Sequence, residues 1–206
     1  MSFVFELLVA VGGVAVGRWL VQRLRTSRAT DRPATDGAPE VPAPLDAFPC
    51  RLGDVVVRKL ERDEAWLAGA LVFEDERPWA ILFIAPESGA DRALLAHAAD
   101  DGLTWLSPLS SGELFMPGEP PLALEYAGAR FERFRRLPVR VRTLGSHTPT
   151  VGDKAVVAEY KGPGTDRIVA VIGADQTRVW RGTALRRWDF EVLPGGQDDA
   201  SEGKAR

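Results

Sequence analysis

The sequence predicts a mostly β protein preceded by one N-terminal transmembrane helix. Two observations support this fold class. Between residues 50 and 194, short apolar runs rich in valine and aromatic residues alternate with glycine, proline and acidic turns. Before them, residues 3–21 are apolar except for Glu6 and Arg18. We therefore expect a membrane anchor at 1–25, a linker at 26–49, a cytoplasmic β-rich domain at 50–194 and a disordered tail at 195–206.

The composition fits one domain of ordinary size with appendages. The chain has 206 residues, a formal net charge of -3 and 45% hydrophobic residues, which is enough for a packed core. Cys50 is its single cysteine, so no intrachain disulfide can form, in keeping with a reducing compartment. Asparagine is absent and arginine greatly outnumbers lysine, which makes any one arginine cluster less informative.

The first element is the apolar segment 3–21. As a helix, its nineteen residues would extend roughly 28 Å, close to the thickness of the bilayer core. The positive charges follow the segment instead of preceding it, unlike those of a secretory signal. Arginines stay on the cytoplasmic side, so the domain should lie in the cytoplasm and the segment in the inner membrane. An amphipathic helix on the membrane surface and a cleaved or soluble segment are the alternatives.

One face of this helix carries small residues at helical spacing. Those positions are Glu6, Ala10, Gly13 and Gly17. Such a stripe lets a second helix approach closely, which would permit self-association or docking on a membrane protein. Glycine and alanine are also common in apolar spans that have no partner.

The β-rich domain follows a linker that is rich in proline, alanine and acidic residues. Its apolar runs are too short and too closely spaced for crossover helices, which predicts antiparallel sheets or small barrels. The stretch GADRALLAHAADD, from residue 89, could instead form one short helix. The segment LGDVVV from Leu52 resembles VGDKAVV from Val151, and an R-x-W sequence follows each. The domain could therefore consist of two related halves, or the likeness could be coincidence.

The domain also resembles an uncharacterised bacterial family, called domain of unknown function 4178. The residues that carry this resemblance are Gly128 with Phe131, Glu159 with Tyr160, Gly182 with Leu185, and WLSPL near Trp105. The resemblance covers most of residues 50–194 and leaves out the N-terminal span. Members of the family often accompany membrane-stress and small membrane proteins in operons, so the resemblance implies an accessory role at a membrane. It implies no catalytic residues.

Catalytic and metal-binding patterns are weak. The two histidines, His97 and His147, stand in no metal-ligand spacing, and no cofactor motif occurs. His97 precedes Asp100 and Asp101, which we interpret as a loop that follows the apolar run. Ser146, His147 and Asp153 lie close together in the sequence, but no nucleophile elbow accompanies them. The glycines of GPGTD, from Gly162, indicate a hairpin turn, because no lysine follows as in a phosphate-binding loop.

The strongest local charge feature is an arginine-rich stretch with Phe131 and Phe134 nearby. Its members are Arg130, Arg133, Arg135, Arg136, Arg140 and Arg142. This stretch could bind anionic lipid of the inner leaflet, or nucleic acid with the phenylalanines stacking on bases. The interpretation we favour is a solvated strand pair whose arginines meet the acids of a net-negative chain, so we consider nucleic acid the weaker candidate.

These observations together predict a non-enzymatic binding or scaffold module held at the membrane, with an unidentified partner. It could serve as an accessory to a bacterial membrane-stress system. A hydrolase-like enzyme, or a domain that binds nucleic acid or anionic lipid, is the alternative.

Overall fold

The computed structural model describes residues 45–87, 91–98, 100–110, 113–114, 116 and 118–195. They form twelve strands and one short helix. The strands are β1 (Val55–Arg58), β2 (Glu64–Trp66), β3 (Gly69–Glu74), β4 (Pro78–Ala85), β5 (Arg92–His97), β6 (Leu103–Pro108), β7 (Ala123–Tyr126), β8 (Ala129–Gly145), β9 (Lys154–Lys161), β10 (Asp166–Ile172), β11 (Thr177–Leu185) and β12 (Phe190–Leu193), and the 3-10 helix is η2 (Arg187–Asp189). The predicted β fold is confirmed. No helix within this part of the chain is long and apolar enough to cross a bilayer.

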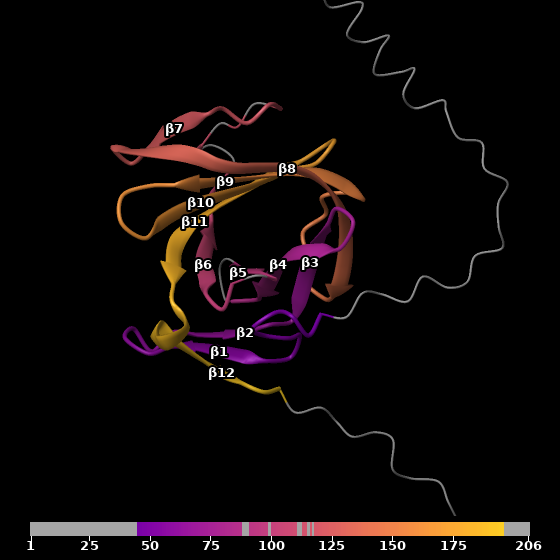
Figure 1. Ribbon diagram of the computed structural model, residues 1–206, viewed down its shortest axis with the longest axis vertical. Coiled ribbons are helices and arrows are strands. Elements are labelled where there is room, and N and C mark those ends of the chain that lie inside the picture. Colours follow the sequence, from indigo (N-terminus) through magenta and orange to yellow (C-terminus); the bar gives the residue numbers. More distant parts are fainter. Residues whose placement is uncertain are drawn as a thin grey trace, which may run out of the picture. The chain divides into compact units, whose positions relative to one another are not determined.

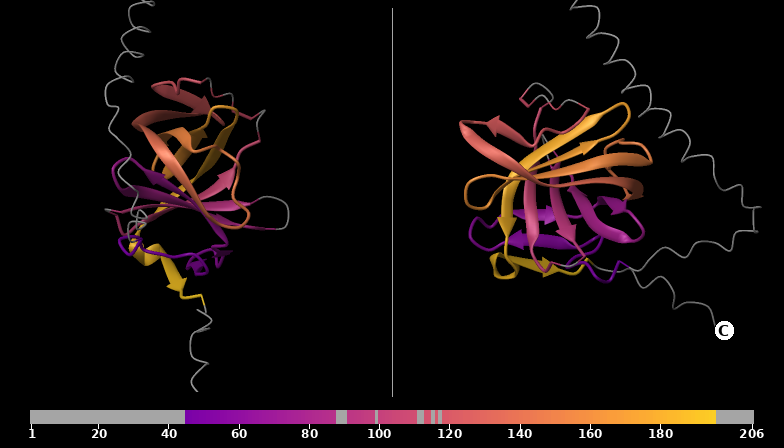
Figure 2. Two further views of the ribbon diagram at one scale, coloured as in Figure 1. Left: turned by 90° about the vertical axis from the view of Figure 1, so that its right-hand side faces the viewer. Right: turned by 45° about the horizontal axis from the view of Figure 1, so that its top comes forward.

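Eight strands close into an antiparallel barrel. Figures 1 and 2 show these strands curving around a common interior. Their order around the barrel is β3, β4, β5, β6, β11, β10, β9 and β8, and β8 pairs with β3 to close it. Strand β7 pairs with the first residues of β8 at Ala123–Tyr126 and extends the sheet beyond the barrel. The remaining strands form a separate sheet in the order β12, β1, β2.

The barrel interior is apolar along most of its length. Side chains alternate between the two faces of a strand, so residues two apart point inward together. Leu71 of β3, Leu82 of β4 and Leu95 of β5 lie in one cross-strand row and are all buried. Val157 and Val171 pair with one another on the opposite wall. This interior cluster stabilises the barrel, because each of the eight strands buries apolar surface in it.

Two further layers cover the outside of the barrel. The sheet of β1, β2 and β12 packs on the outer side of β3–β6 and buries Val56 and Phe190 against Leu94 and Trp105. Figure 1 shows this small sheet lying beside β3–β6. On the other side, Met116 and Leu124 pack against the outward residues of β8–β11, with Phe131 fully buried among them. Three apolar clusters therefore form the core.

The structure corrects three details of the sequence expectations. The stretch that could have been one short helix contains β5, because its apolar residues 93–96 are buried on both faces of the sheet. The two similar segments lie in different sheets, since LGDVVV leads into β1 of the small sheet and VGDKAVV into β9 of the barrel. The packed domain also starts earlier than residue 50, because Phe48 is buried and Leu45 packs beside it.

Candidate functional site

A polar cluster interrupts the apolar interior near one mouth of the barrel. It consists of His97 at the end of β5, Arg135 of β8 and Glu159 of β9. His97 and Glu159 lie two residues beyond the inward-facing Leu95 and Val157, so strand alternation points them inward as well. Glu159 Oε1 lies 3.0 Å from His97 Nε2 and 3.0 Å from Arg135 Nη1. Three strands thus place an imidazole and a guanidinium on one carboxylate oxygen.

Glu159 is the only buried charged residue in the described part of the chain, and it is 4% exposed. A carboxylate at such a depth is costly unless other groups supply hydrogen bonds and opposite charge. Arg135 supplies the positive charge and His97 the second hydrogen bond. An ionised carboxylate only accepts hydrogen bonds, so with Glu159 ionised this contact requires the proton to lie on His97 Nε2. The imidazole orientation is therefore set by Glu159.

Trp79 forms an apolar wall of this cluster. Its ring centroid lies 5.4 Å from that of His97, and Arg135 Cζ lies 5.2 Å from the indole ring. The Trp79 indole nitrogen is buried and has no hydrogen-bond partner in the described structure. A buried donor without a partner is uncommon in folded proteins.

A cavity of about 700 Å³ opens at this mouth. The loops after β5, β9 and β11 surround it, and its volume lies in the range typical of small-molecule sites. The cationic side chains in its lining are Arg135, Lys161, Arg167, Arg186 and Arg187, and the carboxylates are Asp100, Asp101 and Glu159. Five cations against three carboxylates give the lining a formal charge of two positive units.

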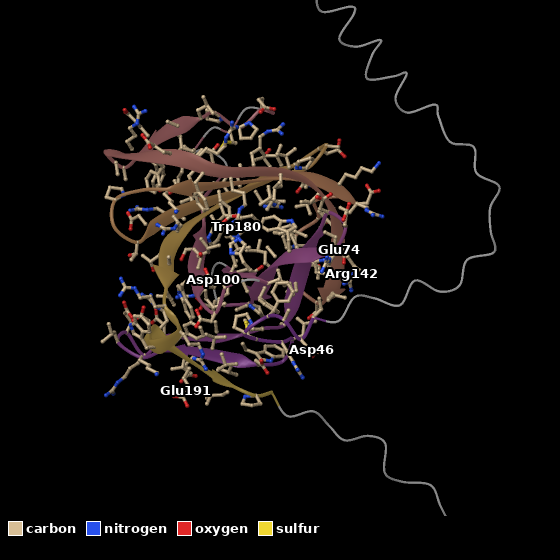
Figure 3. All side chains as sticks on the ribbon, in the orientation of Figure 1. Asp46, Glu74, Asp100, Arg142, Trp180 and Glu191 are labelled. Carbon is tan, nitrogen blue, oxygen red and sulfur yellow. The ribbon has the colours of Figure 1, made fainter. Side chains whose placement is uncertain are left out.

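Most of these cations have no acidic partner. Of the five, only Arg135 lies within 4.0 Å of a carboxylate in the described structure. Arg167 donates to a backbone carbonyl, and Arg187 donates to the Phe190 carbonyl. In contrast, many arginines outside the cavity form ion pairs, as Arg142 does with Glu74 at 3.0 Å, a pair visible in Figure 3. The cavity therefore concentrates positive charge that the domain itself does not neutralise.

Two exposed aromatic rings also belong to the cavity lining. Phe134 is 41% exposed and Trp188, in η2, is 66% exposed. Each ring already has a cation near it: Lys161 Nζ lies 4.6 Å from the centroid of Phe134, and Arg186 Cζ lies 5.3 Å from that of Trp188. Each of these flat apolar surfaces therefore lies beside a positive charge.

The predicted arginine-rich stretch is β8, and most of its members meet acids. Arg130 lies 3.4 Å from Glu132, Arg136 2.9 Å from Glu119, and Arg133 3.8 Å from Glu119. The hydrogen bond from Arg136 lowers the pKa of the Glu119 carboxyl. Arg135 and Arg142 pair with Glu159 and Glu74, as described above. Arg140 alone among the six has no carboxylate within 4.0 Å in the described structure.

The other sequence candidates are placed as follows. The helix-association residues Glu6, Ala10, Gly13 and Gly17 lie outside the described residues. His147 Nδ1 lies 2.9 Å from Ser146 Oγ at an exposed position, and no contact brings Asp153 to the imidazole. The GPGTD segment connects β9 to β10, and Gly164 has a φ of 59°, so the predicted hairpin turn is confirmed.

A second cavity, of about 750 Å³, lies at the opposite mouth, beside the buried Ile84 and Trp180. Figure 3 shows Trp180 inside the barrel. His147 and Arg178 lie at its rim. Asp91 also belongs to its lining, and none of its charged lining residues is buried. The two mouths therefore differ in chemistry, and only the first combines a buried carboxylate with converging cations.

The comparisons with known proteins add no assignment: no family model, no curated protein and no solved structure matches this chain. Within the described ranges, no group of three or more histidine, cysteine, aspartate or glutamate residues is arranged to hold a metal ion.

Proposed function

We propose that this protein is a membrane-tethered binding module whose barrel takes up a small anionic molecule at the mouth that contains Glu159. In this proposal residues 3–21 anchor the chain in the inner membrane and the barrel lies in the cytoplasm. The arginines that follow the apolar segment support that orientation. The unpaired cations that line the cavity support binding, without a chemical reaction, as the role of the barrel.

The observation that carries the proposal is the group of four cations without acidic partners: Lys161, Arg167, Arg186 and Arg187. A chain with a net charge of -3 has enough acids to pair them, yet the structure leaves them facing a common cavity. An anion that binds among these cations gains their attraction without having to break an existing ion pair. Arg135 differs from these four, because Glu159 already engages it.

The buried Glu159 has a supporting role in this arrangement. By holding His97 and Arg135, it fixes the floor of the cavity beneath the free cations. A preformed floor lowers the entropy that a ligand loses when it binds. Glu159 also repels anions that reach too deeply, so the bound charge should lie nearer to Lys161 and Arg167.

The test is a thermal-unfolding screen of the full-length chain in detergent against phosphate, pyrophosphate, citrate and chloride. An anion present at a hundred times its dissociation constant should stabilise the folded state by about 2.7 kcal/mol. For a domain of this size, this corresponds to an increase in melting temperature of roughly 5–10 °C. Chloride at the same ionic strength serves as the control for general salt effects.

Matched variants locate the binding. Lys161→Gln and Arg167→Gln should each reduce the stabilisation by the anion, while Lys154→Gln and Arg140→Gln should leave it unchanged. The control residues are exposed, lie on the same barrel and do not line the cavity. The proposal is wrong if no anion stabilises the chain more than chloride, or if the control variants lose as much stabilisation as the cavity variants.

A second candidate function is suggested by one observation, the His97–Glu159 pair. A carboxylate that orients an imidazole is the arrangement that general acid–base catalysis uses. With Nε2 bound to Glu159, the other ring nitrogen would be the one to exchange a proton with a substrate. Incubating the chain with any anion that binds, and following it by phosphorus or proton NMR, separates the two functions. Turnover that is lost in His97→Gln would establish an enzyme.

A further inference from the structure

The cavity contains features that a simple anion would not use, and we infer that its ligand is a nucleoside polyphosphate. This inference rests on the proposed function and deepens it. It follows from the juxtaposition of four unpaired cations with two exposed aromatic rings around one cavity.

The charge of the lining favours a polyanion over a single carboxylate. The lining has an excess of two positive charges, and four of its cations have no acidic partner within 4.0 Å in the described part of the chain. A monoanion would leave most of them unpaired. A chain of two or three phosphates carries several charges spread over many acceptor oxygens, and the guanidinium group binds such oxygens in pairs.

The exposed rings account for the second half of the ligand. Phe134 and Trp188 expose large apolar surfaces to solvent. Both rings line the same cavity as the cations. Any nucleobase is flat and stacks on aromatic side chains, with a gain of roughly fivefold to a hundredfold in affinity for each stacked base.

The size of the cavity is also suitable. A volume of about 700 Å³ lies within the range of about 300–1,000 Å³ found for pockets that bury a drug-sized ligand. Such a pocket accepts a base, a sugar and two or three phosphates.

The experiment compares ligands that contain one half or both halves of a nucleotide. Isothermal titration calorimetry of the full-length chain in detergent, without divalent cations, would use ATP, GTP, CTP, UTP, tripolyphosphate and adenosine. We expect each nucleoside triphosphate to bind at least tenfold more tightly than tripolyphosphate, and adenosine to bind most weakly. Little discrimination among the four bases is expected, because stacking does not depend on hydrogen bonding to the base edges.

Variants separate the contribution of the ring from that of the charge. Trp188→Leu should weaken ATP about tenfold and leave tripolyphosphate unchanged, whereas Arg167→Gln should weaken both. Trp66→Leu is the matched control for the tryptophan, since Trp66 is 53% exposed and does not line the cavity. Arg140→Gln is the matched control for the arginine.

The outcomes distinguish this inference from the proposed function. If tripolyphosphate binds as tightly as ATP, or if Trp188→Leu weakens both equally, the nucleoside assignment is overturned while anion binding stands. If neither tripolyphosphate nor any nucleotide binds, and the anion screen is also negative, both fail. A single-stranded oligonucleotide that binds at least tenfold more tightly than ATP would replace the small ligand with a nucleic acid.

Discussion

Replacing Glu159 with glutamine tests the central feature of the candidate site. The substitution keeps the size and shape of the side chain and removes its charge, so no cavity forms. Breaking a fully buried ion pair costs about 3–5 kcal/mol, because it leaves the partner charge buried and unpaired. The side chain of Arg135 is 37% exposed, so solvent screening reduces this cost. We expect a loss of about 2 kcal/mol in the free energy of unfolding, which corresponds to a decrease of roughly 4–8 °C in melting temperature.

The assay is urea unfolding of the wild type and the variant, with Glu74→Gln as the matched control. Glu74 also pairs with an arginine of β8, at 3.0 Å, but its side chain is 26% exposed. Such a pair should contribute less than about 1 kcal/mol. A double-mutant cycle with Arg135→Gln then measures the coupling between Arg135 and Glu159 directly. The reasoning is refuted if Glu159→Gln destabilises the fold no more than Glu74→Gln does.

Three further predictions follow from the fold and the topology. Burial, and to a smaller extent the nearby Asp54 carboxylate, raise the pKa of the Cys50 thiol from its usual 9.0 to about 12. Below pH 9.0 the thiol is protonated in both the folded and the unfolded state. Between pH 9.0 and 12 only the unfolded state ionises, so the free energy of unfolding should decrease by up to about 1.4 kcal/mol per pH unit. The variant Cys50→Ala has no thiol and should lack this decrease. A fragment of residues 45–195 should be soluble and show the circular dichroism of a β protein; aggregation in the absence of residues 1–25 would contradict the domain boundary. A C-terminal alkaline phosphatase fusion should be inactive and a fluorescent-protein fusion bright, whereas strong phosphatase activity would reverse the proposed orientation.

The strands were predictable because their signal is local. Runs such as WAILFIA and RIVAVIG have the length and the β-branched or aromatic content of buried strands, and they became β4 and β10. The one ambiguous segment was RALLAHA, which has no β-branched residue and the composition of a good helix former. It forms β5 because it pairs with both β4 and β6, so tertiary pairing overrides its local preference.

Closure of the barrel was not predictable in the same way. It depends on two pairings between strands that lie far apart in the sequence, β3 with β8 and β6 with β11. Neither pairing leaves a turn signal, because no short hairpin joins these strands. Gly182 offers a clue only in retrospect: β11 approaches β6 so closely there that a β-carbon would overlap the Trp105 carbonyl oxygen. Only a residue without a side chain fits this position.

The candidate site was missed for a related reason. His97 and Glu159 are 62 residues apart, and no motif in the sequence links the two. The arginine-rich stretch did contain one member of the site, Arg135. The feature that distinguishes the site, however, is a group of cations without acidic partners, and the sequence alone does not show which cations are paired. No local sequence pattern singles out Lys161, Arg167 and Arg186, because each lies at or beside the end of a different strand. Only the closed barrel brings those ends to one mouth.

The adjacent residues Glu159 and Tyr160 show how one strand connects the inside of the barrel to its outer layer. Glu159 points inward and holds His97 and Arg135, while Tyr160 points outward and is fully buried. The Tyr160 hydroxyl donates to the Pro121 carbonyl at 3.1 Å, and burial raises its pKa, which keeps the donor proton in place. A slip of one residue in the pairing of β9 would exchange the two side chains and leave a carboxylate in the apolar outer layer. The register of β9 is therefore fixed from both faces, and the same register that secures the outer layer sets the floor of the proposed ligand site.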